Sequence, residues 1–217
     1  MKIVAVSDIH GSYLQVEKTL QKENPNILII AGDITTKGNE IEFENAITSF
    51  QKFCKIIFAV CGNMDFPSSE KILEKLNCSI NSNGKIVDYI GFFGVSASPH
   101  SFLKTPYEIS ENEILNRIKT GYRKIQNTKI KILISHTPPF NTKVDKIFNG
   151  QNVGSKNVRQ FLENNSVDIC ICGHIHEASG KDKINKTEIV NCGIAKKNYV
   201  VIEIKNESEF KIILNDI

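Results

Sequence analysis

The feature that most constrains this chain is an alternation, in its N-terminal third, of short apolar runs with amphipathic segments. The apolar runs have the length and composition of buried strands and span 2–7, 27–31 and 55–61. The segments that follow them carry apolar residues at helical spacing and span 13–22, 41–53 and 68–76. Strands that alternate with helices predict parallel strands with helices packed against a sheet.

The rest of the chain predicts a more mixed arrangement. Two runs at 85–88 and 90–95 favour an antiparallel hairpin. Two further buried strands are expected at 129–135 and 167–172. The last three runs are expected to be antiparallel strands that close the fold, at 187–191, 198–205 and 209–214. Helices are expected to begin at caps formed by Ser12, Ser68–Ser69, Ser110 and Ser155.

Together these elements predict an α/β fold of two mixed β-sheets packed face to face and flanked by helices. A length of 217 residues fits one domain of good size. The chain shows no internal repeat, low-complexity segment or linker. We therefore expect a single domain that spans residues 1–217.

Composition excludes several classes of protein. Hydrophobic residues make up 41% and charged residues 24%, as in an ordinary globular protein. A formal net charge of +3 is too small to indicate a nucleic-acid partner. The N-terminal apolar run is too short for a signal peptide, and no run approaches a membrane span. The six cysteines favour buried free thiols, so we expect a cytoplasmic protein without a membrane partner.

Polar residues follow five of the predicted strands, each beside a glycine or a proline. They are Asp8 and His10, Asp33, Asn63, His136, and the pair His174 and His176. In open α/β sheets, ligands bind beyond the carboxyl ends of the strands, so these side chains should line one rim. Any one of them alone is more simply explained as a cap or a surface residue. All seven at such boundaries indicate a common site.

The chemistry of this set indicates divalent metal binding. Carboxylate, amide and imidazole donors together suit borderline ions such as Mn²⁺, Fe²⁺ or Zn²⁺. Seven donors are too many for one ion, and they suit two ions about 3.5–4 Å apart, bridged by a carboxylate.

Five motifs in order resemble those of the calcineurin-like metallophosphoesterase family. They are Asp8-Ile9-His10, Gly32-Asp33, Gly62-Asn63-Met64-Asp65, His136, and Gly173-His174-Ile175-His176. The runs 150–155 and 173–180 also resemble the small stand-alone predicted phosphoesterases of that family. The resemblance implies a four-layer αββα sandwich.

The resemblance also implies a role for each residue. Asp8, His10 and His176 would hold a first metal ion, and Asn63, His136 and His174 a second, with Asp33 bridging the two. A hydroxide between the metals would attack the phosphorus atom, with Asp33, Asn63 and His136 placed around the reacting group as catalytic residues. The expected cofactor is two divalent ions, Mn²⁺ first, with Fe, Zn, Ni or Mg as alternatives.

One position departs from the family pattern. The residue after Asn63 is often histidine in the family and assists proton transfer, but here it is Met64, whose thioether cannot donate a proton. His100, in a loop, is the one histidine outside the motifs and could replace it.

We expect a dinuclear metal-dependent phosphodiesterase or phosphatase acting on a small phosphate ester. The alternative is a catalytically weak or inactive binding or scaffold protein of the same fold, which the Met64 substitution favours. A nuclease is disfavoured, because basic and aromatic residues are not interleaved. The sequence leaves open whether the chain forms a homo-oligomer.

Overall fold

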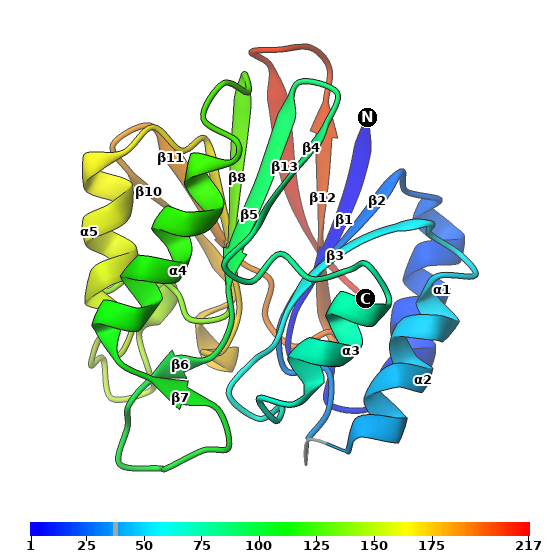
Figure 1. Cartoon of the computed structure of the whole chain (residues 1–217), viewed down its shortest axis with the longest axis horizontal. Helices are drawn as coiled ribbons and strands as arrows, with labels where there is room; N and C mark the ends of the chain where they lie inside the picture. Colours follow the sequence, from blue (N-terminus) through cyan, green and yellow to red (C-terminus); the bar gives the residue numbers. More distant parts are fainter. Residues whose placement is uncertain (37–38) are drawn as a thin grey trace.

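Two β-sheets lie face to face at the centre of the protein, with helices on both outer sides (Figure 1). The computed structural model describes residues 1–36 and 39–217. Helices α1 (Tyr13–Glu23), α2 (Glu40–Phe50) and α3 (Ser69–Lys75) cover one sheet. Helices α4 (Glu111–Arg123) and α5 (Lys156–Asn164) cover the other. This is the four-layer α/β sandwich that the sequence predicts.

The first sheet contains the N-terminal strands and the two C-terminal ones. Its order is β13-β12-β1-β2-β3, in which β1 (Lys2–Val6), β2 (Ile27–Ala31) and β3 (Ile56–Val60) run parallel. The strands β12 (Asn198–Ile204) and β13 (Phe210–Asp216) are antiparallel to their neighbours. The carboxyl ends of β1, β2 and β3 therefore lie at the same edge.

The second sheet has the order β10-β11-β9-β8-β5-β4. Its parallel strands are β5 (Ile90–Val95), β8 (Ile130–Ser135), β9 (Ile169–Cys172) and β11 (Thr187–Asn191). The outer strands β4 (Gly84–Val87) and β10 (Gly180–Ile184) are antiparallel to the strands they pair with. A separate pair joins β6 (Ser98–Pro99) to β7 (Glu108–Ile109).

The main core lies between the two sheets. Side chains of both sheets interdigitate there, including Ile3, Ile29, Phe92, Ile132 and Ile171, all fully buried. A second cluster joins the first sheet to α1–α3, and a third joins the second sheet to α4 and α5. The central strands of each sheet are thus buried on both faces, which explains why they are continuous apolar runs rather than alternating ones.

Several details differ from the sequence-based predictions. Residues 187–191 were predicted to be an antiparallel strand, and this was wrong for one of its two neighbours. β11 runs parallel to β9 and antiparallel to β10, and β10 itself was not predicted. Ser110 and Ser155 cap their helices with side-chain hydrogen bonds. Ser12 and Ser68 stand at the cap positions of α1 and α3, but their side chains form no capping hydrogen bond.

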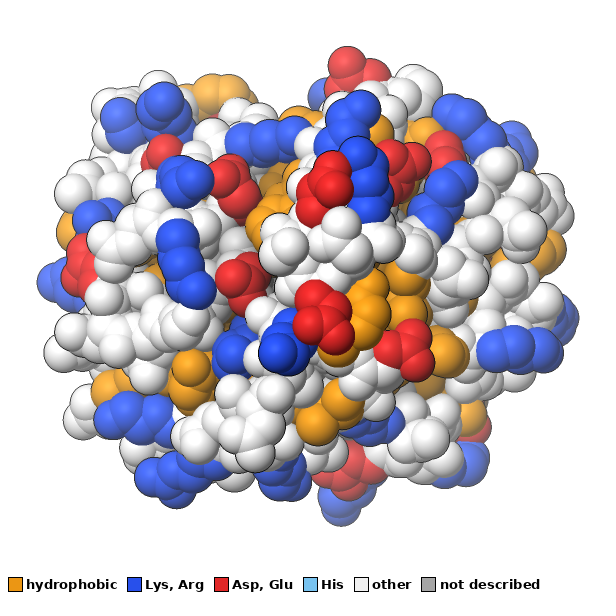
Figure 2. Space-filling model, turned by 90° about the horizontal axis from the view of Figure 1, so that it is seen from above, with side chains coloured by type: hydrophobic (Ala, Val, Ile, Leu, Met, Phe, Trp, Pro, Cys, Tyr) orange, Lys and Arg blue, Asp and Glu red, His pale blue; other side chains and the backbone are white. Residues whose placement is uncertain are grey.

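The six cysteines are all free and buried, as predicted. No helix in the described part of the chain has the length and apolar character needed to cross a bilayer. Figure 2 shows the face near the amino end of β1, where basic and acidic side chains are interspersed and no histidine is visible among those drawn.

Candidate metal centre

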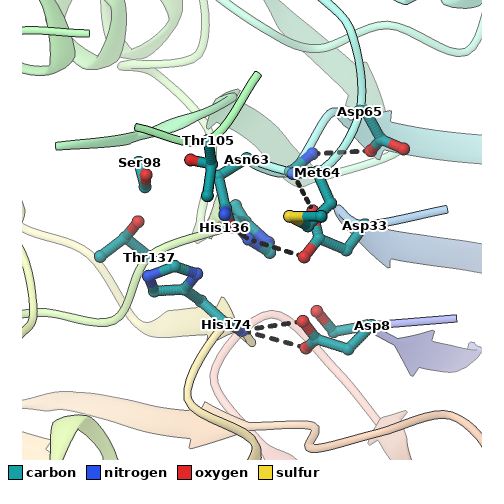
Figure 3. Close-up of polar contacts among 12 residues, drawn as sticks. Asp8, Asp33, Asn63, Met64, Asp65, Ser98, Thr105, His136, Thr137 and His174 are labelled. Carbon is teal, nitrogen blue, oxygen red and sulfur yellow. Dashed lines mark hydrogen bonds and ion pairs between the residues drawn. The ribbon is translucent and has the colours of Figure 1, made fainter. Parts of the chain in front are cut away.

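The polar residues that follow five strands come together at one edge of the sandwich. Asp8, Asp33 and Asn63 follow β1, β2 and β3 of the first sheet. His136 and His174 follow β8 and β9 of the second sheet. Figure 3 shows these side chains facing one another across the space between the sheets. The site therefore forms where the carboxyl ends of parallel strands from both sheets meet.

Backbone hydrogen bonds join neighbouring turns of the site in pairs. The amide of Asp8 donates to the Gly32 carbonyl at 3.0 Å, and the amide of Gly173 donates to the His136 carbonyl at 3.0 Å. Four of the polar residues have a positive φ, between 44° and 69°: Asp8, His10, Asp33 and His174. Left-handed backbone is uncommon outside glycine and concentrates at functional sites, where the surrounding structure stabilises it.

Two glycines allow the turns to approach closely. A Cβ atom on Gly62 would lie 2.0 Å from Asp33 Oδ1, and one on Gly173 would lie 1.7 Å from Ser7 Oγ and 2.3 Å from Asp8 Oδ2. These glycines precede Asn63 and His174 in the sequence motifs. Their role is to leave space for a carboxylate from another strand end.

The first predicted set of ligands forms a compact group. One donor atom from each of Asp8, His10 and His176 lies within 4.8 Å of the other two. His176 Nε2 is 3.2 Å from Asp8 Oδ1, and His10 Nε2 is 4.0 Å from the same oxygen. Two imidazoles and one carboxylate that converge in this way are suited to one divalent ion.

Asp33 lies between the two predicted sets. Its Oδ2 atom is 3.5 Å from His10 Nε2 and 3.6 Å from His136 Nε2. A second compact group is formed by Asp8, Asp33 and His136, again within 4.8 Å. The position of Asp33 fits the predicted bridging role, and Asp8 is the residue that both groups share.

The remaining two predicted ligands lie next to His136. Asn63 Oδ1 is 2.8 Å from His136 Nε2, and the ring centroids of His136 and His174 are 4.9 Å apart. In Figure 3 the backbone nitrogen of His174 contacts Asp8, while its ring is turned toward His136. The ring of His174 belongs to neither compact group.

Burial sets the charge state of these groups. Burial lowers the pKa of His136 and brings that of His174 to about 3, so both rings are neutral and can act as ligands. Burial would raise the pKa of Asp8, but the hydrogen bonds from His176 and Ser7 and the electrostatic interactions with His136 and His176 together outweigh it and hold that pKa below its ordinary value. Burial and the nearby carboxylates Asp8 and Asp65 raise the pKa of Asp33 well above its ordinary value.

The carboxylates and lone pairs of this site would be better satisfied with a cation bound than without one. Among the described residues, no Lys or Arg forms an ion pair with the buried carboxylates Asp8 and Asp33. His136 Nδ1 is 2.8 Å from the Ala31 carbonyl, so a neutral ring donates there and leaves an Nε2 lone pair facing Asn63 Oδ1. Both atoms carry lone pairs that one divalent cation could accept.

Asp65 has a structural role in the same loop. Its carboxylate accepts hydrogen bonds from the amides of Ile34, Thr35 and Gly62, at 2.8–3.2 Å, and from the Thr35 hydroxyl. It therefore joins the turn after β2 to the turn after β3. The backbone amide of Met64 donates to Asp33 Oδ1 at 2.8 Å.

The fold and this set of strand-end residues define a class of phosphoesterase. The family model for calcineurin-like phosphoesterases matches residues 1–178, and the chain belongs to that family. It is similar over its whole length to an uncharacterized protein of Methanocaldococcus jannaschii, with 32% identity over 223 aligned residues that cover 96% of that protein.

Solved structures share the fold at low sequence identity. A protein of Thermus thermophilus has a TM-score of 0.75 and 13% identity, with 99% of this chain and 98% of that chain covered. A 5'-nucleotidase from Candida albicans has a TM-score of 0.60 and 13% identity, with 99% of this chain and 51% of that chain covered. This likeness extends to the fold alone.

Proposed function

We propose that the protein is a metal-dependent phosphoesterase with two divalent ions per chain, which hydrolyses a small phosphodiester or phosphomonoester. The single observation that carries this proposal is the position of Asp33, between imidazoles of the two predicted ligand sets at 3.5 and 3.6 Å. Both sheets contribute to the site, so we propose that residues 1–217 act as one domain.

Each residue of the site has a definable task. Asp8, His10 and His176 would hold one ion, Asn63, His136 and His174 the other, and Asp33 would contact both. The bound ions would activate a water molecule as the nucleophile and neutralise charge on the phosphoryl oxygens. Asp8 and Asp33 would offset part of the positive charge, so that the ions stay bound while the site attracts an anion. The Ala31 carbonyl would orient the His136 ring through Nδ1.

The test is turnover by the purified chain after its metal has been removed and Mn²⁺ supplied. We expect hydrolysis of bis(p-nitrophenyl) phosphate that depends on Mn²⁺ and stops when a chelator is added. Metal analysis of the same sample should give about two ions per chain. A preparation that binds two ions and hydrolyses neither this diester nor p-nitrophenyl phosphate would support the scaffold alternative, which the missing histidine at position 64 favours.

His100 is the residue we propose as proton donor to the leaving group. It lines the same cavity as Asn63 and His174, and its Nδ1 atom is 4.0 Å from Glu108 Oε2. As the bond from phosphorus to the leaving oxygen breaks, the imidazolium would pass its proton to that oxygen. General acid catalysis contributes roughly 10²–10⁴-fold in rate when the leaving group needs a proton.

His100→Gln therefore should slow the hydrolysis of diphenyl phosphate by about 10²-fold or more. It should change the hydrolysis of bis(p-nitrophenyl) phosphate little, because nitrophenolate leaves without a proton. The two diesters have similar shapes, so the comparison of their kcat values separates proton transfer from binding. An equal loss with both esters, or no loss with either, would exclude His100 as the donor.

A further inference from the structure

A cavity of about 310 Å³ opens beside the candidate metal centre. Three of the predicted ligands, Asn63, His174 and His176, form part of its lining. A phosphoryl group held at the metal centre would therefore extend its organic group into this cavity. The volume is at the small end of the range for ligand pockets, about 300–1,000 Å³, and suits a single compact group.

Three segments give this cavity an apolar wall. One loop, which follows β6, contributes Phe102 and Leu103, with side chains 92% and 67% exposed. On the other side, Ile147 and Val153 line the cavity from the segment that follows β8, and Ile175 lines it from the turn after β9. Large apolar side chains exposed around a hollow mark a ligand-binding surface when they gather in this way.

The loop that carries Phe102 and Leu103 is fixed in place by one carboxylate. Glu108 accepts hydrogen bonds from the amide and hydroxyl of Ser101 and from those of Thr105, at 2.8–2.9 Å. Burial would raise the pKa of Glu108, but these four hydrogen bonds outweigh it and lower that pKa to about 2. The apolar wall is thus preformed, which reduces the entropy lost when a ligand binds.

The charge of the cavity restricts its ligand further. Its lining, over the part of the chain that the structure describes, contains no Lys or Arg, and its one carboxylate is that of Glu177. The Glu177 side chain accepts a hydrogen bond from the Phe148 amide at 3.2 Å, which holds it at the rim. A second phosphate or a carboxylate on the ligand would find no lysine or arginine among these lining residues and would lie near a negative charge. The lining imidazole of His100 is assigned to the leaving oxygen in the proposed function, and those of His174 and His176 to the metal ions.

We propose that this cavity selects phosphate esters whose organic group is compact, uncharged and ring-bearing, and disfavours polyphosphates and nucleic-acid strands. The phosphoryl position rests on the proposed function. The contacts that select the organic group do not, because they come from side chains outside the metal centre.

The test measures binding rather than turnover. Isothermal titration of the Mn²⁺-loaded protein with phenylphosphonate and with methylphosphonate compares two non-hydrolysable ligands that differ by the ring. We expect phenylphosphonate to bind about tenfold or more tightly, from burial of the ring. In the Phe102→Ser, Leu103→Ser double variant this preference should fall to about threefold or less. Equal affinities for the two ligands in the parent protein would overturn the proposal.

Two controls make the test specific. Ile41, on α2, is 76% exposed and does not line the cavity, so Ile41→Ser should keep the preference for the ring. 4-Phosphonobenzoate adds a charge to the ring and should bind about tenfold more weakly than phenylphosphonate, with part of the loss recovered in Glu177→Gln. Binding of 4-phosphonobenzoate as tight as that of phenylphosphonate would contradict the charge argument.

These outcomes are independent of catalysis. A protein that prefers phenylphosphonate but hydrolyses no ester would keep the cavity proposal and refute the proposed enzyme. A protein that hydrolyses esters but shows no preference for the ring would keep the proposed enzyme and refute the cavity proposal.

Discussion

Asp33→Asn is expected to reduce the bound metal from about two ions per chain to one or none, and to lower turnover of an aryl phosphodiester by at least about 10²–10³-fold. The carboxylate of Asp33 is 3.5 Å from His10 Nε2 and 3.6 Å from His136 Nε2, so one side chain serves both sides of the site. An amide at this position keeps the size but removes the negative charge that a bridging ligand supplies.

The matched control for this variant is Asp88→Asn. Asp88 lies in the turn between β4 and β5, is exposed, and has a φ of 54°, close to the 50° of Asp33. Asparagine tolerates a left-handed backbone as well as aspartate does, so both variants preserve the local fold. Inductively coupled plasma mass spectrometry should show about two ions per chain in Asp88→Asn. Full metal content in Asp33→Asn would mean that Asp33 is not a bridging ligand.

Much of the site could be predicted from the sequence because of how parallel strands are arranged. Each strand of β1–β3 and β8–β9 is buried on both faces, so each is a short apolar run with an abrupt end that is visible in the sequence. Parallel strands place these ends at one edge. The residues Asp8, Asp33 and His136 therefore meet in space although each alone is an ordinary strand end.

Other features depend on pairings that local sequence does not determine. β10 is half exposed and rich in charge, with the sequence Gly180-Lys181-Asp182-Lys183-Ile184, so it lacks the apolar run that marks the buried strands. The direction of β11 relative to β9 is fixed by the chain's path through β10 and not by residues 187–191 themselves. The apolar wall was missed for a similar reason: Phe102 and Val153 are isolated in loops, and only the fold brings them to one cavity.

Gly173→Ala should damage both the stability of the fold and the metal site. The added Cβ would lie 1.7 Å from Ser7 Oγ and 2.3 Å from Asp8 Oδ2, and neither atom has free space. Ser7 Oγ is held by its hydrogen bond to the Ala31 carbonyl at 3.0 Å, and Asp8 is fully buried. Overpacking of this kind costs about 1–3 kcal/mol or more, which corresponds to a fall in Tm of roughly 2–12 °C for a domain of this size.

Gly180→Ala separates this steric effect from the loss of glycine as such. A Cβ at position 180 would have only the Ala178 carbonyl oxygen near it, at 3.8 Å, which is an ordinary contact. The Gly180→Ala protein should match the parent in Tm, measured by differential scanning calorimetry, and in metal content. The added Cβ would displace Asp8, a ligand of the first predicted set, and Gly173 directly precedes His174, a ligand of the second, so Gly173→Ala should weaken the binding of both ions. A Gly173→Ala protein that retained its full Tm and both ions would show that the strand ends of the two sheets are not in the close contact on which the site depends.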